Sequence, residues 1–193
     1  MNLTRPTKKL IRPLVLALTF AGAPAVAVAS ASTATAATCA TTTAPWGSLT
    51  KSLHRMTTAS ITNVRAGRHA CFDRMVVDLK GKGAGSTVRY VSQVLSQGQG
   101  AVIPLRGGAK LDVLIKAPAY DINTGASTYS PANSRELVNV TGFSTFRQIA
   151  SGGSFEGYTT IGLGVRARLP MRAFVLAGPG TGSRVVIDVA HRW

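Results

Sequence analysis

The chain is 193 residues long, carries 22 Lys and Arg against 7 Asp and Glu, and has a formal net charge of +15. This length fits one ordinary domain, which can build a core without a metal or many disulfides. After residue 29, no segment approaches the roughly 18 apolar residues that a transmembrane helix needs, so we expect no integral membrane span in the mature protein.

The first 29 residues have the layout of a secretory signal peptide. Four basic residues lie at its start, an apolar run follows over 14–29, and small residues offer cleavage between about 29 and 37. A membrane helix is the alternative, but the run is short and contains Pro24. The mature protein is therefore expected to be secreted, extracellular or cell-wall associated, with a charge of roughly +11.

Residues 30–58 form an Ala/Thr-rich arm with few bulky apolar side chains, which we expect to be flexible except where Cys39 and Trp46 pin it. Trp46 is either a packing anchor or a ligand platform. In an exported chain the two cysteines, Cys39 and Cys71, are expected to form a disulfide. Two alternatives have less support: a lipoprotein Cys39 lacks the usual preceding leucine, and a nucleophilic Cys71 served by His69 lacks a third, orienting group.

Strand signals dominate from residue 59 onward. Apolar residues alternate along 72–79, where Met75, Val77 and Leu79 share one face. Further strands are expected over 87–95, 101–105, 110–116, 136–141, 146–150, 155–169, 171–177 and 184–190, with a turn at Gly152-Gly153 and a helix within 136–150 as an alternative. The predicted fold is an all-β, antiparallel β-sandwich of about 8–10 short strands, a single domain over 59–193.

Two glycines, Gly162 and Gly164, lie on one face of an expected strand and indicate a bulge or the close approach of another backbone. A long loop over 117–134 separates the two halves of the domain, and loops of this length are commonly functional or disordered. Its Tyr120 and Tyr129, together with Tyr158, are candidates for stacking on sugar rings, because an aromatic face is apolar. The alternative for each tyrosine is packing at the rim of the core.

Two segments carry the same pattern of Arg, apolar, Val, apolar, Asp, apolar: Arg74 to Leu79 and Arg184 to Val189. The repetition suggests two equivalent strands, one in each of two packed sheets. In one interpretation the aspartates accept structural hydrogen bonds from backbone or arginine groups. In the other, the four charged residues form a catalytic or ligand-binding set.

No catalytic constellation is recognisable. The histidines His54, His69 and His191 have no metal-binding spacing, the carboxylates form no glycosidase pair, and the glycine-rich stretches lack a strand–loop–helix context for phosphate. The sequence therefore predicts no enzyme, no metal site and no cofactor.

Several segments together resemble the AMIN-like domain of secreted actinobacterial proteins. They are Cys39 with Trp46 to Ser48, Arg65 to Asp78, Phe155 to Gly157 with Gly162 to Val165, and Arg184 to Val189. The most specific part is Gly-Arg-His-Ala-Cys-Phe-Asp-Arg at 67–74, and the resemblance covers nearly all of 39–190. It implies an all-β, non-enzymatic envelope module similar to the AMIN domain of cell-wall amidases and secretins.

Together these observations predict a secreted, non-enzymatic envelope module that binds peptidoglycan or an anionic cell-wall polymer, since a basic surface attracts polyanions. Its candidate ligand contacts are Arg65, Arg68 and His69 together with the three tyrosines. The alternative is an extracellular protein–protein interaction or inhibitor module. No nucleic acid is expected as a partner of an exported protein, and the sequence contains no signal for an oligomeric state.

Overall fold

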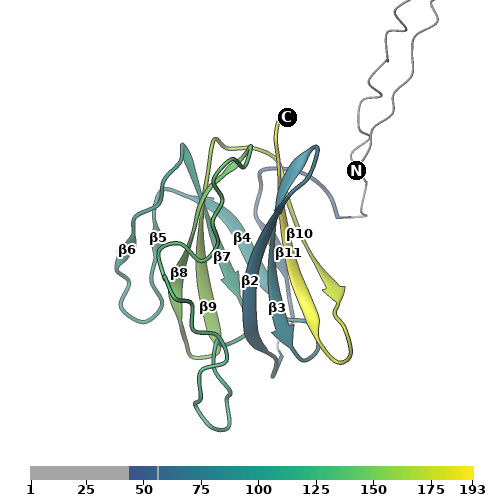
Figure 1. Cartoon of the computed structure of the whole chain (residues 1–193), viewed down its shortest axis with the longest axis vertical. Helices are drawn as coiled ribbons and strands as arrows, with labels where there is room; N and C mark the ends of the chain where they lie inside the picture. Colours follow the sequence, from purple (N-terminus) through teal and green to yellow (C-terminus); the bar gives the residue numbers. More distant parts are fainter. Residues whose placement is uncertain (1–43, 56) are drawn as a thin grey trace, which may run out of the picture. The chain divides into compact units, whose positions relative to one another are not determined.

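The computed structural model describes residues 44–55 and 57–193, and it is all-β over this range (Figure 1). The strands in chain order are β1 Lys51–Leu53, β2 Ser60–Arg68, β3 Phe72–Lys80, β4 Ser86–Val91, β5 Val94–Leu95, β6 Val102–Ile103, β7 Ala109–Ile115, β8 Phe146–Phe155, β9 Tyr158–Val165, β10 Met171–Ala177 and β11 Ser183–Ala190. The predicted signal peptide, most of the predicted arm and Cys39 lie outside the described residues.

Two antiparallel sheets pack as a sandwich, as the alternating sequence pattern predicted. The four-stranded sheet has the order β10-β11-β3-β2, and the five-stranded sheet has the order β1-β4-β7-β9-β8. A small hairpin of β5 and β6 stands apart from both. The fold class predicted from the many short strand segments is thus confirmed.

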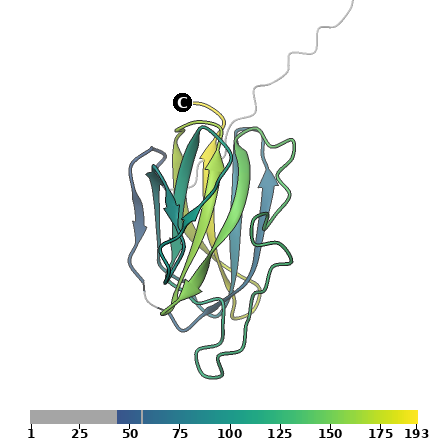
Figure 2. The ribbon, with the colours of Figure 1, turned by 90° about the vertical axis from the view of Figure 1, so that its left-hand side faces the viewer.

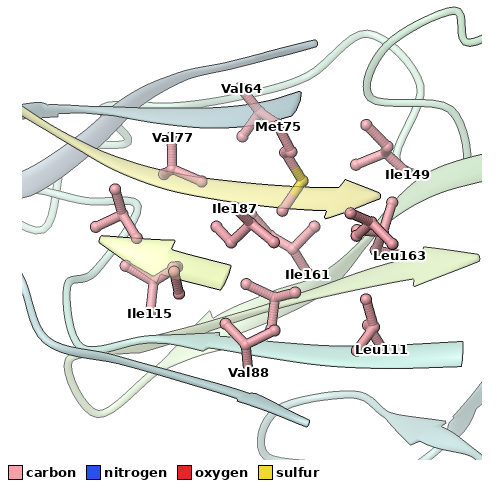
Figure 3. Close-up of a cluster of buried hydrophobic side chains, with 14 of the residues drawn as sticks. Val64, Met75, Val77, Val88, Leu111, Ile115, Ile149, Ile161, Leu163 and Ile187 are labelled. Atoms are coloured by element: carbon pink, nitrogen blue, oxygen red, sulfur yellow. The ribbon is translucent and has the colours of Figure 1, made fainter. Parts of the chain in front are cut away.

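The hydrophobic core fills the space between the two sheets (Figure 3). Met75 and Val77 of β3 and Ile187 of β11 contribute from the four-stranded sheet, and Leu111 of β7 and Ile161 of β9 contribute from the other. All five side chains are 0–1% exposed, and full burial of such a side chain stabilises the fold by about 1.5–3 kcal/mol. The face predicted for Met75 and Val77 is thus the core face.

The two segments of repeated pattern lie side by side in one sheet, so the prediction of one copy per sheet is wrong. β3 and β11 pair antiparallel, and the register places Asp188 opposite Arg74 and Arg184 opposite Asp78. Antiparallel pairing reverses one copy against the other, so an Arg meets an Asp at both ends of the pattern. Of these two positions, Arg74 and Asp188 form an ion pair, whereas Asp78 pairs with Arg65 of β2 and Arg184 donates to Ala177 O.

Glycine on the outer face of β9 admits another segment of the chain. A Cβ atom at Gly164 would lie 2.0 Å from the carbonyl oxygen of Arg106, and one at Gly162 would lie 2.9 Å from Leu105 Cδ1. The connection that follows β6 therefore crosses directly over these glycines, which is the close approach that the sequence indicated.

Two sequence-based assignments in the second half of the domain are wrong. The expected strand over 136–141 is not formed, and neither is a helix there. Gly152 and Gly153 do not form a turn, because they lie within β8 at an irregularity between Ser151 and Ser154. A Cβ atom at Gly152 would lie 2.6 Å from Thr160 Cγ2, so this glycine is required by close packing against β9.

The two open sides of the sandwich are closed differently. On the side of β2 and β8, the connection 116–145 runs along both edges, and in Figure 2 its green trace lies along the margin opposite the purple-blue β1. Ile61 N donates to Pro118 O at 2.8 Å, and Leu137 N donates to Ile149 O at 2.8 Å. On the side of β1 and β10, the short segment 46–53 bridges the sheets, because Gly47 bonds to Met171 of β10 and β1 pairs with β4.

Candidate functional site

One end of the sandwich carries a cleft of about 460 Å³ between chain segments that are far apart in the sequence. Here β3 and β10 begin and β11 ends, next to the C-terminus in Figure 1. We call this surface the tryptophan cleft. It is lined by Trp46, Ala70, Cys71, Pro170, Ala190, His191, Arg192 and Trp193.

Hydrogen bonds hold the segment after β11 against its neighbours. His191 N donates to Cys71 O at 2.9 Å, and Arg166 Nη2 donates to His191 O at 2.5 Å. Trp193 Nε1 donates to Arg168 O at 3.3 Å, while 76% of the Trp193 residue surface stays exposed. The indole of Trp193 is therefore both held in place and open to solvent, which is the condition for an aromatic stacking platform.

Trp46 forms the opposite wall and is the better buried of the two tryptophans. Its ring lies 4.3 Å from the guanidinium of Arg172 and 5.9 Å from the ring of Phe72. Gly47 N donates to Met171 O at 3.1 Å, and Met171 N donates to Gly47 O at 2.9 Å, so main-chain bonds fix the tryptophan next to β10. Trp46 thus serves as a packing anchor while one part of it still lines the cleft.

A buried ion cluster supports this wall from below. Asp188 is 0% exposed and accepts hydrogen bonds from Arg74 Nε at 2.6 Å and Arg172 Nε at 2.8 Å. The hydrogen bond to Asp188 raises the pKa of Arg74, which keeps the guanidinium charged. Because both carboxylate oxygens are engaged, Asp188 has a structural role and does not act as an acid or base.

The charge around the tryptophan cleft is positive. Arg166, Arg168 and Arg192 are all exposed at this end of the sandwich. The side chain of Asp73, which contacts His191 of the lining, is fully buried and accepts from Thr145 N at 2.6 Å and from Phe146 N at 3.0 Å. Its other oxygen lies 3.1 Å from His191 Nε2. Asp73 therefore ties the two sheets together and presents no carboxylate to a ligand.

Two of the predicted contacts, Arg68 and His69, lie on the turn that leads into this cleft. Both are exposed, and the His69 ring stacks on Phe72 with centroids 4.5 Å apart. Arg68 Nη1 donates to Gly142 O at 3.2 Å. Arg65 lies further along β2, where its ion pair with Asp78 at 2.7 Å raises the pKa of the arginine. The predicted basic stretch is therefore divided between the rim of the cleft and the outer face of the sheet.

The three predicted tyrosines lie elsewhere. Tyr120 and Tyr129 line a neutral cavity of about 300 Å³ beneath the connection 117–134, and Tyr158 is not part of its lining. The Tyr120 hydroxyl accepts from Gly157 N at 3.2 Å. Burial raises the pKa of Tyr129, which packs against the core. The structure thus brings two of the three tyrosines together, away from the arginines.

Sequence analysis missed Trp193, Arg192 and Arg168 as members of a site. The available signal was the His-Arg-Trp run directly after the last strand, which combines cations with an aromatic residue. This run indicates a binding site only in combination with Trp46, and the local sequence pattern does not predict that Trp46 lies next to β10.

Other chemistry has little support in this region. Cys71 is not a free thiol, and its predicted disulfide partner Cys39 lies outside the described residues, so the pairing stays a prediction. Among residues 44–55 and 57–193, no group of three His, Cys, Asp or Glu side chains is arranged to hold a metal ion. In the same range no helix is long and apolar enough to cross a membrane.

The fold and the cleft define a basic β-sandwich with a concave aromatic surface at one end. The AMIN-like domain model matches residues 59–191, and the chain belongs to this family, as the sequence resemblance indicated. AMIN-like domains are typically non-catalytic, occur in extracellular envelope proteins and point to cell-wall binding in general. No curated protein and no solved structure matches the chain.

Proposed function

We propose that this domain is a secreted, non-enzymatic module that binds an anionic cell-wall polymer or peptidoglycan in the tryptophan cleft. The observation that carries the proposal is the pairing of a held, exposed Trp193 with cationic side chains in one cleft. An indole stacks on the C–H face of a sugar ring, and Arg192 supplies a charge for a carboxylate or phosphate.

The electrostatics of the cleft support an anionic ligand. Exposed arginines surround the two tryptophans, while Asp73 points into the domain and is saturated by backbone donors. A positive surface whose lining residues include no Asp or Glu raises the local concentration of polyanions, and the effect weakens as salt screens it. Arg68 and His69, on the adjacent turn, would extend the same surface along a polymer.

Retention of the mature protein on purified sacculi, at low and moderate salt, tests the proposal. Sacculi stripped of their anionic polymers distinguish the two ligands, because peptidoglycan binding survives stripping and binding to an anionic polymer does not. We expect Trp193→Ala to lower the affinity about tenfold, which corresponds to about 1.4 kcal/mol. Failure to bind either preparation at either salt concentration would remove the proposed function.

Matched controls separate the cleft from overall charge. Arg192→Glu and Arg135→Glu make the same charge change at two exposed positions, but only Arg192 lines the cleft. Phe155→Ala is the aromatic control, since half of Phe155 is exposed and it lies outside the cleft. Equal losses for Arg192→Glu and Arg135→Glu would show that binding follows net charge and not this site.

A further inference from the structure

A second concave surface, which the proposed function does not use, lies between β10 and the chain that follows β1. It has a volume of about 660 Å³, and we call it the β10 groove. Its wall on one side is the second half of β10 and the turn to β11, and its other walls are residues 53–55 and 82–84. The apolar part of the lining consists of Leu53, Ala84, Phe174, Val175, Leu176 and Ala177.

The edge of β10 that faces away from β11 is open at Val175 within the groove, while the next outward carbonyl, that of Ala177, accepts from Arg184 Nη2 at 2.6 Å. Ala190 N donates to Pro170 O, and Gly178 N donates to Gly182 O, so the even-numbered residues of β10 bond to β11. The odd-numbered residues therefore direct their N–H and C=O groups outward. Among the residues that the structure describes, no group bonds to the backbone of Val175.

The chain already uses the first position of this edge. Met171 is the first outward residue of β10, and it exchanges two main-chain hydrogen bonds with Gly47. This bridge shows that the edge accepts an antiparallel strand through backbone bonds. Beyond Met171 the edge continues into the groove, whereas the edge of β2 is bonded by Pro118 and that of β8 by Leu137.

The groove is lined by cations and by no carboxylate. His54, Arg55 and Lys82 are its charged or titratable lining residues. A Cβ atom at Gly83 would lie 3.1 Å from Val175 Cγ1 and 3.2 Å from Arg55 Nη1, so Gly83 has the Val175 side chain and the Arg55 guanidinium as neighbours within the groove. A strand that enters the groove would therefore bring its side chains next to Arg55.

We propose that the β10 groove binds an extended, acidic segment of a partner protein, which adds a strand to β10 at Val175. Backbone bonds to the free edge supply affinity, and the cations select acidic side chains. A second copy of this chain fits poorly, because the same cations would face one another across a two-fold axis. The inference stands independently of wall binding in the tryptophan cleft.

The first probe is a capped eight-residue peptide that alternates Val and Glu, with a Val/Lys peptide as its control, measured by fluorescence anisotropy. We expect the acidic peptide to bind and the basic peptide not to bind. Two further acidic peptides carry N-methyl groups on odd or on even residues. Only every second residue of an added strand faces its neighbour, so one of these two should bind at least about tenfold more weakly than the other.

Variants of the full mature chain locate the site. Val175→Pro removes the outward N–H without removing a bond to β11, and edge strands tolerate proline. We expect it to weaken the acidic peptide about tenfold, while Val175→Ala, which keeps the N–H, has little effect. Arg55→Glu and Lys82→Glu should weaken the peptide and leave retention on sacculi unchanged, and Arg192→Glu should do the reverse. Thermal melts show whether each variant is folded.

Three results would overturn the inference. One is an absence of acidic-peptide binding at millimolar concentration. Another is equal affinity for the two N-methylated peptides, which would show that charge alone attracts them. The third has two parts: dodecyl phosphate displaces the peptide, and Val175→Pro binds this amphiphile with unchanged affinity. That result would make the groove a site for small anionic amphiphiles.

Discussion

The two open sides of this sandwich differ in how far other chain segments cover their outer strand edges. On the β2 and β8 side, the connection 116–145 bonds to both strand edges and packs Tyr129 and Leu137 on the core. On the β1 and β10 side, residues 46–53 bridge only part of the gap and leave the β10 groove. On the sealed side, the edge groups of Ile61 and Ile149 already bond to the connection. On the open side, no described group bonds to the main chain of Val175. A strand edge that is covered by the chain itself has a structural role, whereas an uncovered edge is available to bind an added strand.

Each side is anchored by a fully buried aspartate. Asp188 holds Arg172 of β10 on the open side, and Asp73 holds Thr145 and Phe146 where the sealing connection ends. We expect the open side to lose more stability than the sealed side when its anchor is removed.

Removing the anchor of the open side should have the largest cost. Asp188→Ala leaves Arg172, which is 1% exposed, without its carboxylate, and loss of one partner of a buried pair typically costs about 3–5 kcal/mol. Urea denaturation measures this loss. Asp78→Ala is the matched control, because Asp78 and Arg65 keep 25% and 49% of their side chains exposed, and such pairs contribute about 0–1 kcal/mol. Comparable losses for the two variants would contradict the assigned difference in burial.

Removing the anchor of the sealed side should cost somewhat less. Asp73→Ala takes the acceptor from the N–H groups of Thr145 and Phe146, and we expect a loss of about 2–4 kcal/mol in the free energy of unfolding. Hydrogen exchange at these two amides should accelerate beyond what the global loss explains. Asp112→Ala, at an exposed pair with Arg89, serves as the control. Unchanged exchange at Thr145 would show that water replaces the carboxylate without cost.

Loosening the sealing connection alone should have a local effect of about 1 kcal/mol. Thr128 Oγ1 donates to Ile61 O at 2.7 Å, so Thr128→Val detaches the connection from β2 at that point. Limited proteolysis within 117–134 should become faster while the melting temperature changes little. Thr124→Val is the control, since Thr124 Oγ1 bonds only within the loop, to Ala126 N. Equal protease sensitivity of the two variants would mean that this bond does not hold the connection.

Acid should relax only the tip of the same connection. Hydrogen bonds from the backbone N–H groups of Asn123 and Thr124 lower the pKa of Asp121, which is exposed. The lowered value means that Asp121 stabilises the turn at pH above its ordinary pKa of 3.8, and that this contribution disappears as the pH falls through the lowered value. Amide exchange of Asn123 should rise there, and Asp121→Asn should remove the transition.

The sequence predicted the fold well where one face of a strand is buried. The bounds of β10 and nearly those of β3 and β11 followed from short runs rich in apolar and β-branched residues that end at turn residues. Alternation failed at 136–141, where Leu137 and Val140 contact the core from a segment that is not a strand. Apolar residues mark contact with the core, and only hydrogen bonding to neighbours decides whether the segment is a strand.

The sites were less accessible to sequence analysis. Tyr120 and Tyr129 were predicted to lie on one long loop, and they line one cavity beneath it. The tryptophan cleft combines Trp46 with residues more than a hundred positions away, and the β10 groove depends on which strand forms an edge. Both properties arise from strand order, which local patterns do not specify.

The ion cluster around Asp188 also constrains when this domain can become stable. Arg74 and Asp188 are 114 positions apart, and β11 lies between β3 and β10 in the sheet. Until β11 is in place, β10 lacks its neighbouring strand in the sheet and Arg172 lacks the Asp188 carboxylate, so the four-stranded sheet cannot close. Contacts of such large sequence separation slow folding. The four-stranded sheet is therefore complete only once the last strand of the chain, β11, has taken its central place.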